Sequence, residues 1–246
     1  MLETILPEGL SVVETREDVP DATLFPEEEP VVARAVEKRR AEFTTVRHCA
    51  RRAMAELGLP PAPLVPGERG APRWPSGVVG SMTHCAGYRA AVVGRASEFR
   101  SVGVDAEPHD ALPEGVLDTV ALPTERERLA ALRRERPEVH WDRLLFSAKE
   151  SVYKAWFPLT GRWLDFEEAD LVFGPGPGSA GTFEARLLVP GHTTSGDPLT
   201  GFAGRWRVEA GLVCTAIAVL APVRSTPPAP RADRPSSAPT TTPPKP

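Results

Sequence analysis

The sequence predicts an α+β protein built from two lobes of comparable size. Two long segments, residues 31–57 and 140–157, carry apolar side chains at the spacing of a helix that packs one face on a core. Several β-like runs follow each of these segments. The runs are residues 78–82, 88–93 and 101–107 after the first segment, and 170–173, 182–189, 201–208 and 212–220 after the second. Helix and strand therefore occur in similar amounts in each half.

Glycine and proline mark the ends of these elements. Gly58 and Pro60 end the first helical stripe, which is clearest from Phe43 onward, and residues 60–77 read as a loop. A turn around Ala86 and Gly87 separates two of the strands, residues 123–136 read as a charged helix, and Pro158 is expected to stop the last helix. We expect an N-terminal lobe over 1–103, a C-terminal lobe over 104–224, and a disordered Pro/Ser/Thr-rich tail over 225–246.

Composition excludes several classes of protein. With 41% hydrophobic and 25% charged residues and a net charge of −4, the 246-residue chain is an ordinary globular protein with no general affinity for nucleic acid. No apolar run approaches the roughly 18 residues of a membrane span, and the N-terminus does not read as a signal peptide. Cys49, Cys85 and Cys214 are far apart without CxxC spacing, which predicts free thiols in a cytoplasmic protein.

The strand at 101–107 places two acids on one face. Alternate residues of a strand share a face, so Asp105 and Glu107 lie about 7 Å apart, while Val104 and its alternate neighbours point to the core. Carboxylates this close repel unless a cation lies between them, and oxygen ligands suit Mg²⁺. The alternative is a strand end with two solvated acids.

Glu150 and Lys154 are four residues apart on the second long helix, and hence neighbours on one face. They could form a simple surface pair worth about 0.2–0.5 kcal/mol. Against that alternative, only four of the 29 Lys and Arg residues are lysines, and two of these lie at positions 149 and 154. His84 lies in a run of small residues between two strands, where it serves either as a functional group or as a structural hydrogen bonder.

Together these pieces resemble a known family. The segments GVDAE, FSAKESVYKAW and SMTHCAGY are similar to those of the Sfp-type 4′-phosphopantetheinyl transferases. The family pattern is G-[IV]-D-x-E, followed some 40 residues later by [WF]-x-x-K-E-[AS]-x-x-K; here Asp105 and Glu150 are 45 residues apart. The resemblance covers roughly residues 35–165 and is nearest to the branch of enterobactin-synthase components and actinobacterial transferases.

The resemblance implies a monomer of two pseudo-symmetric α/β lobes with the active site between them. Such an enzyme moves the phosphopantetheine arm of coenzyme A to a serine of a fatty-acid, polyketide or peptide carrier protein. It implies that Asp105, Glu107 and Glu150 hold Mg²⁺, or Mn²⁺ in its place. It also implies that Glu150 takes the serine proton, directly or through a metal-bound water, and that Lys154 contacts the pyrophosphate.

Coenzyme A needs cations for its phosphates, and arginine suits phosphate well. The resemblance assigns Arg39 and Arg47 to the nucleotide end, and Thr83 and His84 to a phosphate. Arg69 stands where similar proteins place a lysine, which leaves its role open. Trp163 lies just after the helix and forms either a wall for the pantetheine arm or part of the core.

The carrier partner is expected to dock on the charged helix between the two acid motifs. The predicted contacts are Leu129, Leu132, Arg133, Arg134 and Arg136, which combine apolar and basic groups for an acidic carrier helix. The alternative is a solvated helix face. Two other functions stay open: another Mg²⁺-dependent phosphotransferase, although no GxxxxGK[ST] loop or HRD-type kinase set is present, or a carrier-binding relative without catalysis.

Overall fold

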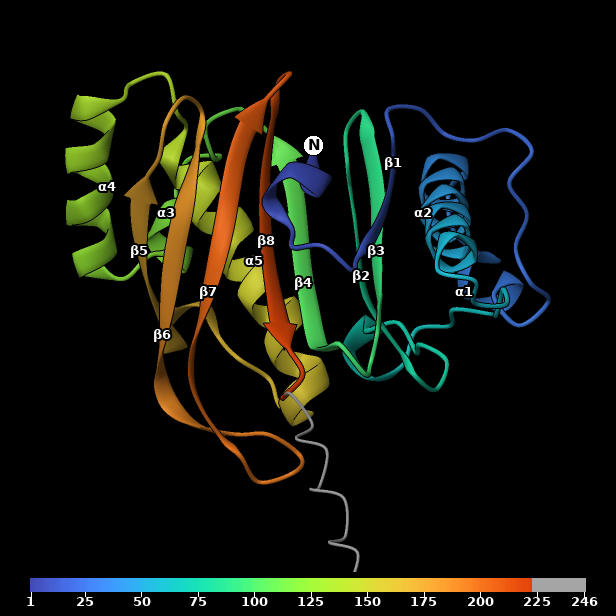
Figure 1. The fold of residues 1–246 in the computed structure, drawn as a ribbon. Helices are drawn as coiled ribbons and strands as arrows, with labels where there is room; N and C mark the ends of the chain where they lie inside the picture. Colours follow the sequence, from blue (N-terminus) through green and yellow to red (C-terminus); the bar gives the residue numbers. More distant parts are fainter. Residues whose placement is uncertain (223–246) are drawn as a thin grey trace, which may run out of the picture.

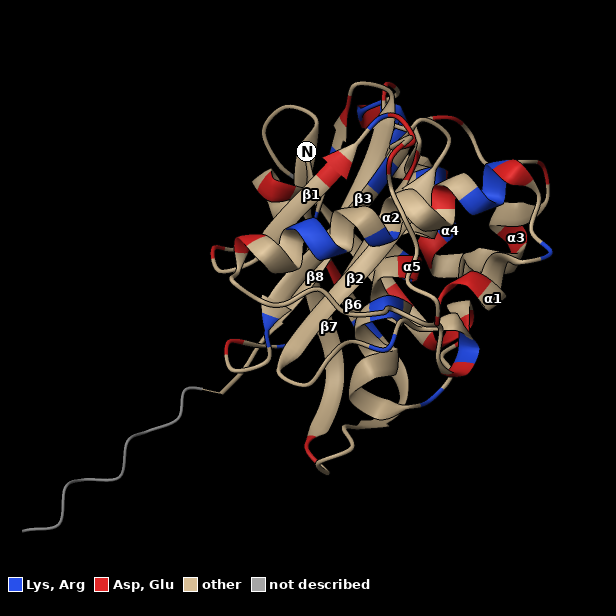
Figure 2. Ribbon diagram, turned by 90° about the vertical axis from the view of Figure 1, so that its right-hand side faces the viewer, with Lys and Arg blue, Asp and Glu red and all other residues tan. Residues whose placement is uncertain are grey.

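The computed structural model describes residues 1–222, so the tail predicted at 225–246 lies outside the described residues. Two antiparallel sheets and the helices packed on them make up the fold (Figure 1). The α+β class predicted from the sequence is therefore confirmed. No helix within residues 1–222 is long and apolar enough to cross a membrane. Acidic and basic residues are intermixed over the helices that Figure 2 turns to the viewer.

The first sheet has three strands in the order β1-β3-β2. Its strands are β1 (Ser11–Thr15), β2 (Val78–Cys85) and β3 (Tyr88–Arg95). Helix α2 (Glu37–Glu56) covers this sheet, with Phe43, Ala50 and Met54 buried beneath it (Figure 1). The β2–β3 hairpin turns at Ala86 and Gly87, as predicted, because Gly87 adopts a φ of 72° that favours glycine.

The second sheet has five strands in the order β4-β8-β7-β6-β5. Its strands are β4 (Phe99–Pro108), β5 (Ala169–Pro175), β6 (Ala180–His192), β7 (Pro198–Glu209) and β8 (Leu212–Leu220). Helix α5 (Trp141–Thr160) packs on this sheet, and Trp156 and Trp206 lie fully buried in the core between them. Helix α4 (Pro123–Glu135) lies at the outer edge beside β5 (Figure 1).

All predicted helices and strands are present, with ends that shift by a few residues. The first helix begins at Glu37 rather than at residue 31, and short elements that the sequence did not reveal precede or separate the long ones. These are η1 (Leu2–Ile5), β1, α1 (Glu29–Val32), η2 (Glu68–Gly70), α3 (Val116–Val120) and η3 (Phe166–Glu168). Each spans too few residues to establish a period.

Pro158 does not stop the last helix, so the sequence prediction that it would do so was wrong. Helix α5 continues to Thr160 and ends at Gly161, whose φ of 65° forms a left-handed cap and whose N–H donates to the Phe157 carbonyl. Proline removes one backbone donor from the helix. This loss falls in the last turn of α5, where Gly161 supplies the terminal hydrogen bond instead.

The two sheets meet where β2 runs along β4, and side chains join them there. The Val104 N–H donates to the Ser81 hydroxyl and the Ala106 N–H donates to the Thr83 hydroxyl, each with an N···O distance of 3.1 Å. Ser81 and Thr83 are both buried. The predicted division at residues 103 and 104 stays a prediction about folding units; it falls within β4, which is continuous across it.

Strand β4 has the two faces that the sequence predicts. Val102, Val104 and Ala106 are buried in the core. On the opposite face, a Cβ added to Gly103 would lie 2.1 Å from the Ser151 carbonyl oxygen of α5. Glycine is therefore needed at this position, because it lets α5 approach β4 closely enough to place the two acid motifs side by side.

Candidate active site

A cavity of about 450 Å³ opens between α2, the loop at 66–74, strand β2 and the second half of α5. It gathers side chains from motifs that are far apart in the sequence. Six of the predicted site residues line it: Arg39, Arg47, Arg69, His84, Glu150 and Lys154. Thr83, Asp105, Glu107 and Trp163 are not among its lining residues, and their positions are described next.

Asp105 is a buried carboxylate, 4% exposed, beside the cavity. Its Oδ1 accepts hydrogen bonds from Lys154 Nζ at 2.7 Å and from the Thr83 hydroxyl at 3.2 Å. Its Oδ2 is also buried and finds no hydrogen-bond partner among residues 1–222. An unpartnered buried oxygen of this kind is costly, which marks Asp105 as a place where a ligand would be accommodated. The Thr83 hydroxyl thus donates to Asp105 and accepts from the Ala106 N–H of β4.

Glu107 follows Asp105 on the same face and is held by an arginine that the sequence did not single out. Arg143, in the first turn of α5, donates to Glu107 Oε2 at 3.0 Å and also to the carbonyls of Asp110 and Ala111. Burial, and then the charge of Asp105, raise the pKa of Glu107, while Arg143 opposes the shift. The two acids of β4 therefore interact, so they are not independent solvated groups.

Glu150 and Lys154 do not form the simple surface pair that the sequence left open. Lys154 projects toward β4, where its ammonium also donates to the Val104 carbonyl at 3.2 Å in addition to its bond to Asp105. Burial raises the pKa of Glu150; the charge of Lys154 opposes this shift and that of Asp105 adds to it. A carboxylate with a raised pKa is a stronger base, as a group that accepts a proton requires.

Asp105, Glu107 and Glu150 have several features of a site for a divalent cation. Their donor atoms are all oxygens, Asp105 raises the pKa of both glutamates, and Asp105 Oδ2 is free of protein partners in the part of the chain that the structure describes. These features suit Mg²⁺. In residues 1–222, however, no three Asp, Glu, His or Cys side chains are already arranged around a common metal position. Lys154 and Arg143 instead hold Asp105 and Glu107.

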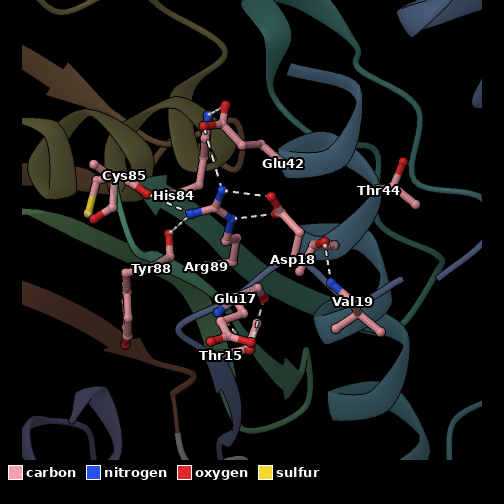
Figure 3. Close-up of polar contacts among 12 residues, drawn as sticks. Thr15, Glu17, Asp18, Val19, Glu42, Thr44, His84, Cys85, Tyr88 and Arg89 are labelled. Carbon is pink, nitrogen blue, oxygen red and sulfur yellow. Dashed lines mark hydrogen bonds and ion pairs between the residues drawn. The ribbon is translucent and has the colours of Figure 1, made fainter. Parts of the chain in front are cut away.

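His84 lies on β2 at the side of the cavity nearest α2. Its Nε2 accepts a hydrogen bond from Arg39, so Nε2 is unprotonated in this arrangement. Burial, and then the charge of Arg39, lower the pKa of His84; Glu42 opposes the shift and Lys154 and Arg89 add to it. Figure 3 shows His84 close to Glu42 and Arg89.

Arg47 and Arg69 both line the cavity, but they differ in burial and in how far their guanidinium groups are fixed by hydrogen bonds. Arg47 is buried, donates to the Leu64 and Phe43 carbonyls, and has a pKa lowered by burial to about 10. Arg69 is exposed in η2, and its guanidinium lies 5.0 Å from the ring of Trp163. Trp163 is 48% exposed, so the alternative that it belongs to the core is wrong.

The predicted carrier-docking helix is only partly available. Leu129 is 6% exposed and Leu132 is partly buried; both pack into the core of the second sheet. Arg136 donates to the carbonyls of Gly176 and Gly178. The prediction that Leu129 offers a surface contact is therefore wrong, because α4 turns its apolar face inward. Arg133 and Arg134 are exposed.

The comparisons with known proteins agree with the motifs at this cavity. The 4′-phosphopantetheinyl transferase N-terminal domain matches residues 27–94, and the 4′-phosphopantetheinyl transferase superfamily matches residues 101–193. The chain is 60% identical over 225 residues to 4′-phosphopantetheinyl transferase Svp of Streptomyces mobaraensis, covering 90% of each chain. It is 56% identical over 223 residues to 4′-phosphopantetheinyl transferase PptT of Mycobacterium tuberculosis, covering 88% of this chain and 97% of the relative.

A more distant similarity covers part of the chain. Enterobactin synthase component D of Salmonella typhi is 39% identical over 124 residues, which is 48% of each chain. The two long matches, at more than half identity, each cover about nine-tenths of this chain. The chain belongs to the 4′-phosphopantetheinyl transferase superfamily.

Proposed function

We propose that this enzyme transfers the 4′-phosphopantetheine arm of coenzyme A to a serine hydroxyl of an apo carrier protein and releases 3′,5′-ADP. The names of its relatives state the transferred group. The observation that carries the proposal is the cavity itself. It combines Arg39, His84 and Lys154, which can bind phosphate, with Glu150, which can accept a proton.

The cavity suits coenzyme A in charge and size. A volume of about 450 Å³ lies within the range of pockets that bind small ligands. Arg39 and Arg69 carry charge at positions where it can meet the phosphates of the nucleotide end, and Trp163 offers an exposed ring beside Arg69. Arg47 contributes positive charge from a fixed position, because its donors already bind backbone carbonyls.

Asp105, Glu107 and Glu150 are the residues that would hold Mg²⁺. When bound, the ion supplies positive charge for the pyrophosphate oxygens, which stabilises the charge that develops during phosphoryl transfer. Mn²⁺ offers similar oxygen chemistry and is the expected substitute. Lys154 supplies further positive charge, and it would have to share Asp105 with the ion.

The reaction needs a proton acceptor and a stabilised leaving group. The serine oxygen bonds to the β-phosphorus, and the bond from that phosphorus to the oxygen of 3′,5′-ADP breaks. The serine proton passes to Glu150, whose pKa burial raises. Lys154, an ammonium with three donors, stabilises charge on the pyrophosphate oxygens.

Separate observations support the proposals for the partner and for the cellular location. Arg133 and Arg134 stay as proposed contacts for an acidic carrier, since they are exposed on α4. A cytoplasmic location is proposed because all three cysteines are free thiols. The monomeric state is likewise a prediction.

One mass measurement tests the function. The protein is mixed with coenzyme A, Mg²⁺ and an apo carrier, and the intact mass of the carrier is read. We expect a gain of one phosphopantetheine group, no gain on a carrier whose acceptor serine is replaced by alanine, and no gain in EDTA until Mg²⁺ or Mn²⁺ is restored. A different phosphotransferase would leave no such adduct, and a binding protein would leave the carrier unchanged. Transfer at full rate in persistent chelator would contradict the metal proposal alone.

A further inference from the structure

Glu42 lines a cavity suited to a polyanion and, unlike Glu150, has no part in the proposed metal site. It projects from α2 into the same space as Arg39, His84 and Lys154, and it is only 9% exposed. A carboxylate here repels phosphate, so its presence calls for a compensating role. The position of its two oxygens supplies one: Oε1 lies 3.7 Å from Arg89 Nη2, and Oε2 lies 3.6 Å from His84 Nε2.

Arg89 forms an ion pair with the Glu42 carboxylate. It lies 5% exposed on the central strand β3, directly opposite His84 in the register of the β2–β3 hairpin. Its guanidinium binds both oxygens of Asp18, at 2.7 and 3.2 Å, and donates to the Cys85 carbonyl at 2.8 Å (Figure 3). With its fork fixed in this way, Arg89 presents a stationary positive charge to Glu42.

His84 is the group on which this arrangement converges. Arg39 now donates to its Nε2, which requires the neutral imidazole with its proton on Nδ1. Arg39 lies on the exposed surface of α2, free to turn toward a phosphate. Once Arg39 turns away, Nε2 faces the Glu42 carboxylate at 3.6 Å, a distance that a small side-chain movement converts into a hydrogen bond.

We propose that Glu42 is a positioning residue for His84, held in place by Arg89, and that it lets His84 become protonated when coenzyme A binds. In this state Nε2–H donates to Glu42 and Nδ1–H is left to donate to phosphate. The ring gains a positive charge that outweighs the repulsion between Glu42 and the ligand. This inference rests on the proposed function, because it takes coenzyme A as the ligand.

The charged groups around His84 fit this role. Arg39 and Glu42 face it from α2, Arg89 from β3 and Lys154 from α5; of these four, Glu42 is the acidic one. Burial and the three cations lower the pKa of His84, and Glu42 counteracts them. Without the carboxylate, the pKa of His84 would be lower still, and the neutral form would be favoured further.

The first test reads His84 directly, in the free protein. Histidine side chains are titrated by NMR, with the His84 signal assigned by its loss in His84→Gln. We expect Glu42→Gln to lower the pKa of His84 by about one unit, the lower end of the effect of a charge at this distance. Glu37→Gln, which removes the same charge from an exposed position on α2, should leave the pKa unchanged. An unchanged pKa in Glu42→Gln would overturn the proposal.

The second test measures coenzyme A affinity by calorimetry from pH 6 to 8.5. Binding that depends on protonated His84 is strongest below its pKa and weakens as the pH rises through it. Glu42→Gln should therefore move this decline to lower pH and weaken binding near pH 7.5 by about tenfold, the change that corresponds to one pKa unit. If Glu42 only balances the charge of Arg89, removing it strengthens phosphate binding instead, and that result would refute the inference.

A second variant guards against a folding defect. Arg89→Lys keeps the positive charge but loses the fork that holds Asp18, so Glu42 loses its fixed neighbour. Thermal melting checks that each variant is folded, and we expect Arg89→Lys to change the His84 pKa and the affinity in the same direction as Glu42→Gln, by a smaller amount. Opposite directions in the two variants would contradict the proposal. The His84 titration needs neither substrate nor turnover, so it can fail while transfer to a carrier succeeds, or the reverse.

Discussion

Helix α5 carries two lysines, Lys149 and Lys154, whose surroundings in the structure differ. Lys149 lies on the side of α5 that faces α4, called the outer side here, and is buried with Glu125. Its ammonium lies 2.8 Å from the Glu125 carboxylate and donates to the Phe166 and Ala169 carbonyls. Lys154 lies on the opposite, inner side, which faces β4, and it is placed between Asp105 and the cavity. Lys149 therefore uses all three donors of its ammonium within the protein.

The difference separates a structural charge from a functional one. Glu125 is itself fully engaged, since it also accepts from the backbone N–H groups of Leu122 and Leu171. Around Lys154, by contrast, Asp105 Oδ2 has no partner within the described chain, and burial raises the pKa of Glu150. Charges that are completely paired stabilise a fold, whereas charges left incompletely paired await a ligand.

The largest effect is expected from Glu150→Gln on the inner side. The amide keeps the shape of the side chain but cannot accept the serine proton, and general-base catalysis contributes about 10²–10⁴-fold in rate. Turnover should fall by at least that lower figure while coenzyme A still binds and the melting temperature is kept. Steady-state kinetics at saturating Mg²⁺ provide the check, and a loss of less than tenfold would remove the base assignment.

On the outer side, Lys149→Met should reverse this pattern. It leaves the Glu125 carboxylate buried without its cation, and breaking a buried pair in this way typically costs about 3–5 kcal/mol. Denaturant unfolding measures the loss, and the folded variant should retain normal affinity for coenzyme A. Adding Glu125→Gln should recover part of the stability. A stable Lys149→Met enzyme that cannot turn over would show that the two lysines share a catalytic role.

Lys154→Arg tests whether the inner lysine needs its compact ammonium. The guanidinium is a wide planar fork that would pair with Asp105 or Glu150 in place of the pyrophosphate. We expect normal folding, turnover reduced by about tenfold or more, and weaker coenzyme A binding, since one lost charge-assisted contact contributes about 1.5–3 kcal/mol. Near-wild-type kinetics together with an unchanged melting temperature would make Lys154 a simple ion-pair partner.

The smallest effect is expected at the outer edge of the second sheet. Strand β5, beside α4, is four strand spacings from β4, or about 19 Å. Reversing Arg133 and Arg134 to Glu should raise the KM for an acidic carrier only a few-fold, because exposed charges contribute little each. Arg134→Glu alone and Arg205→Glu, at an exposed arginine on β7, form a matched pair of single charge reversals. A loss of carrier recognition confined to the α4 variant would show that this helix docks the partner.

The sequence was most informative where function depends on local pattern. Alternation along β4 placed Asp105 and Glu107 on one face, and helical spacing placed Glu150 beside Lys154, because each relation involves residues a few positions apart. Arg143, Glu125 and Glu42 were not found, since their partners come from other elements and nothing in the local sequence marks them. Leu129 was misassigned for the same reason: the apolar face of an isolated helix does not reveal which neighbour will cover it.

The hydrogen bonds between β2 side chains and the backbone of β4 also protect two strand edges. Both strands are the outermost members of their sheets, and an open strand edge is a template on which another chain can add and aggregate. Here the hydroxyls of Ser81 and Thr83 occupy backbone donors of β4 that would otherwise recruit such a chain. The threonine that binds Asp105 thus also helps to close the edge of β4 to other chains.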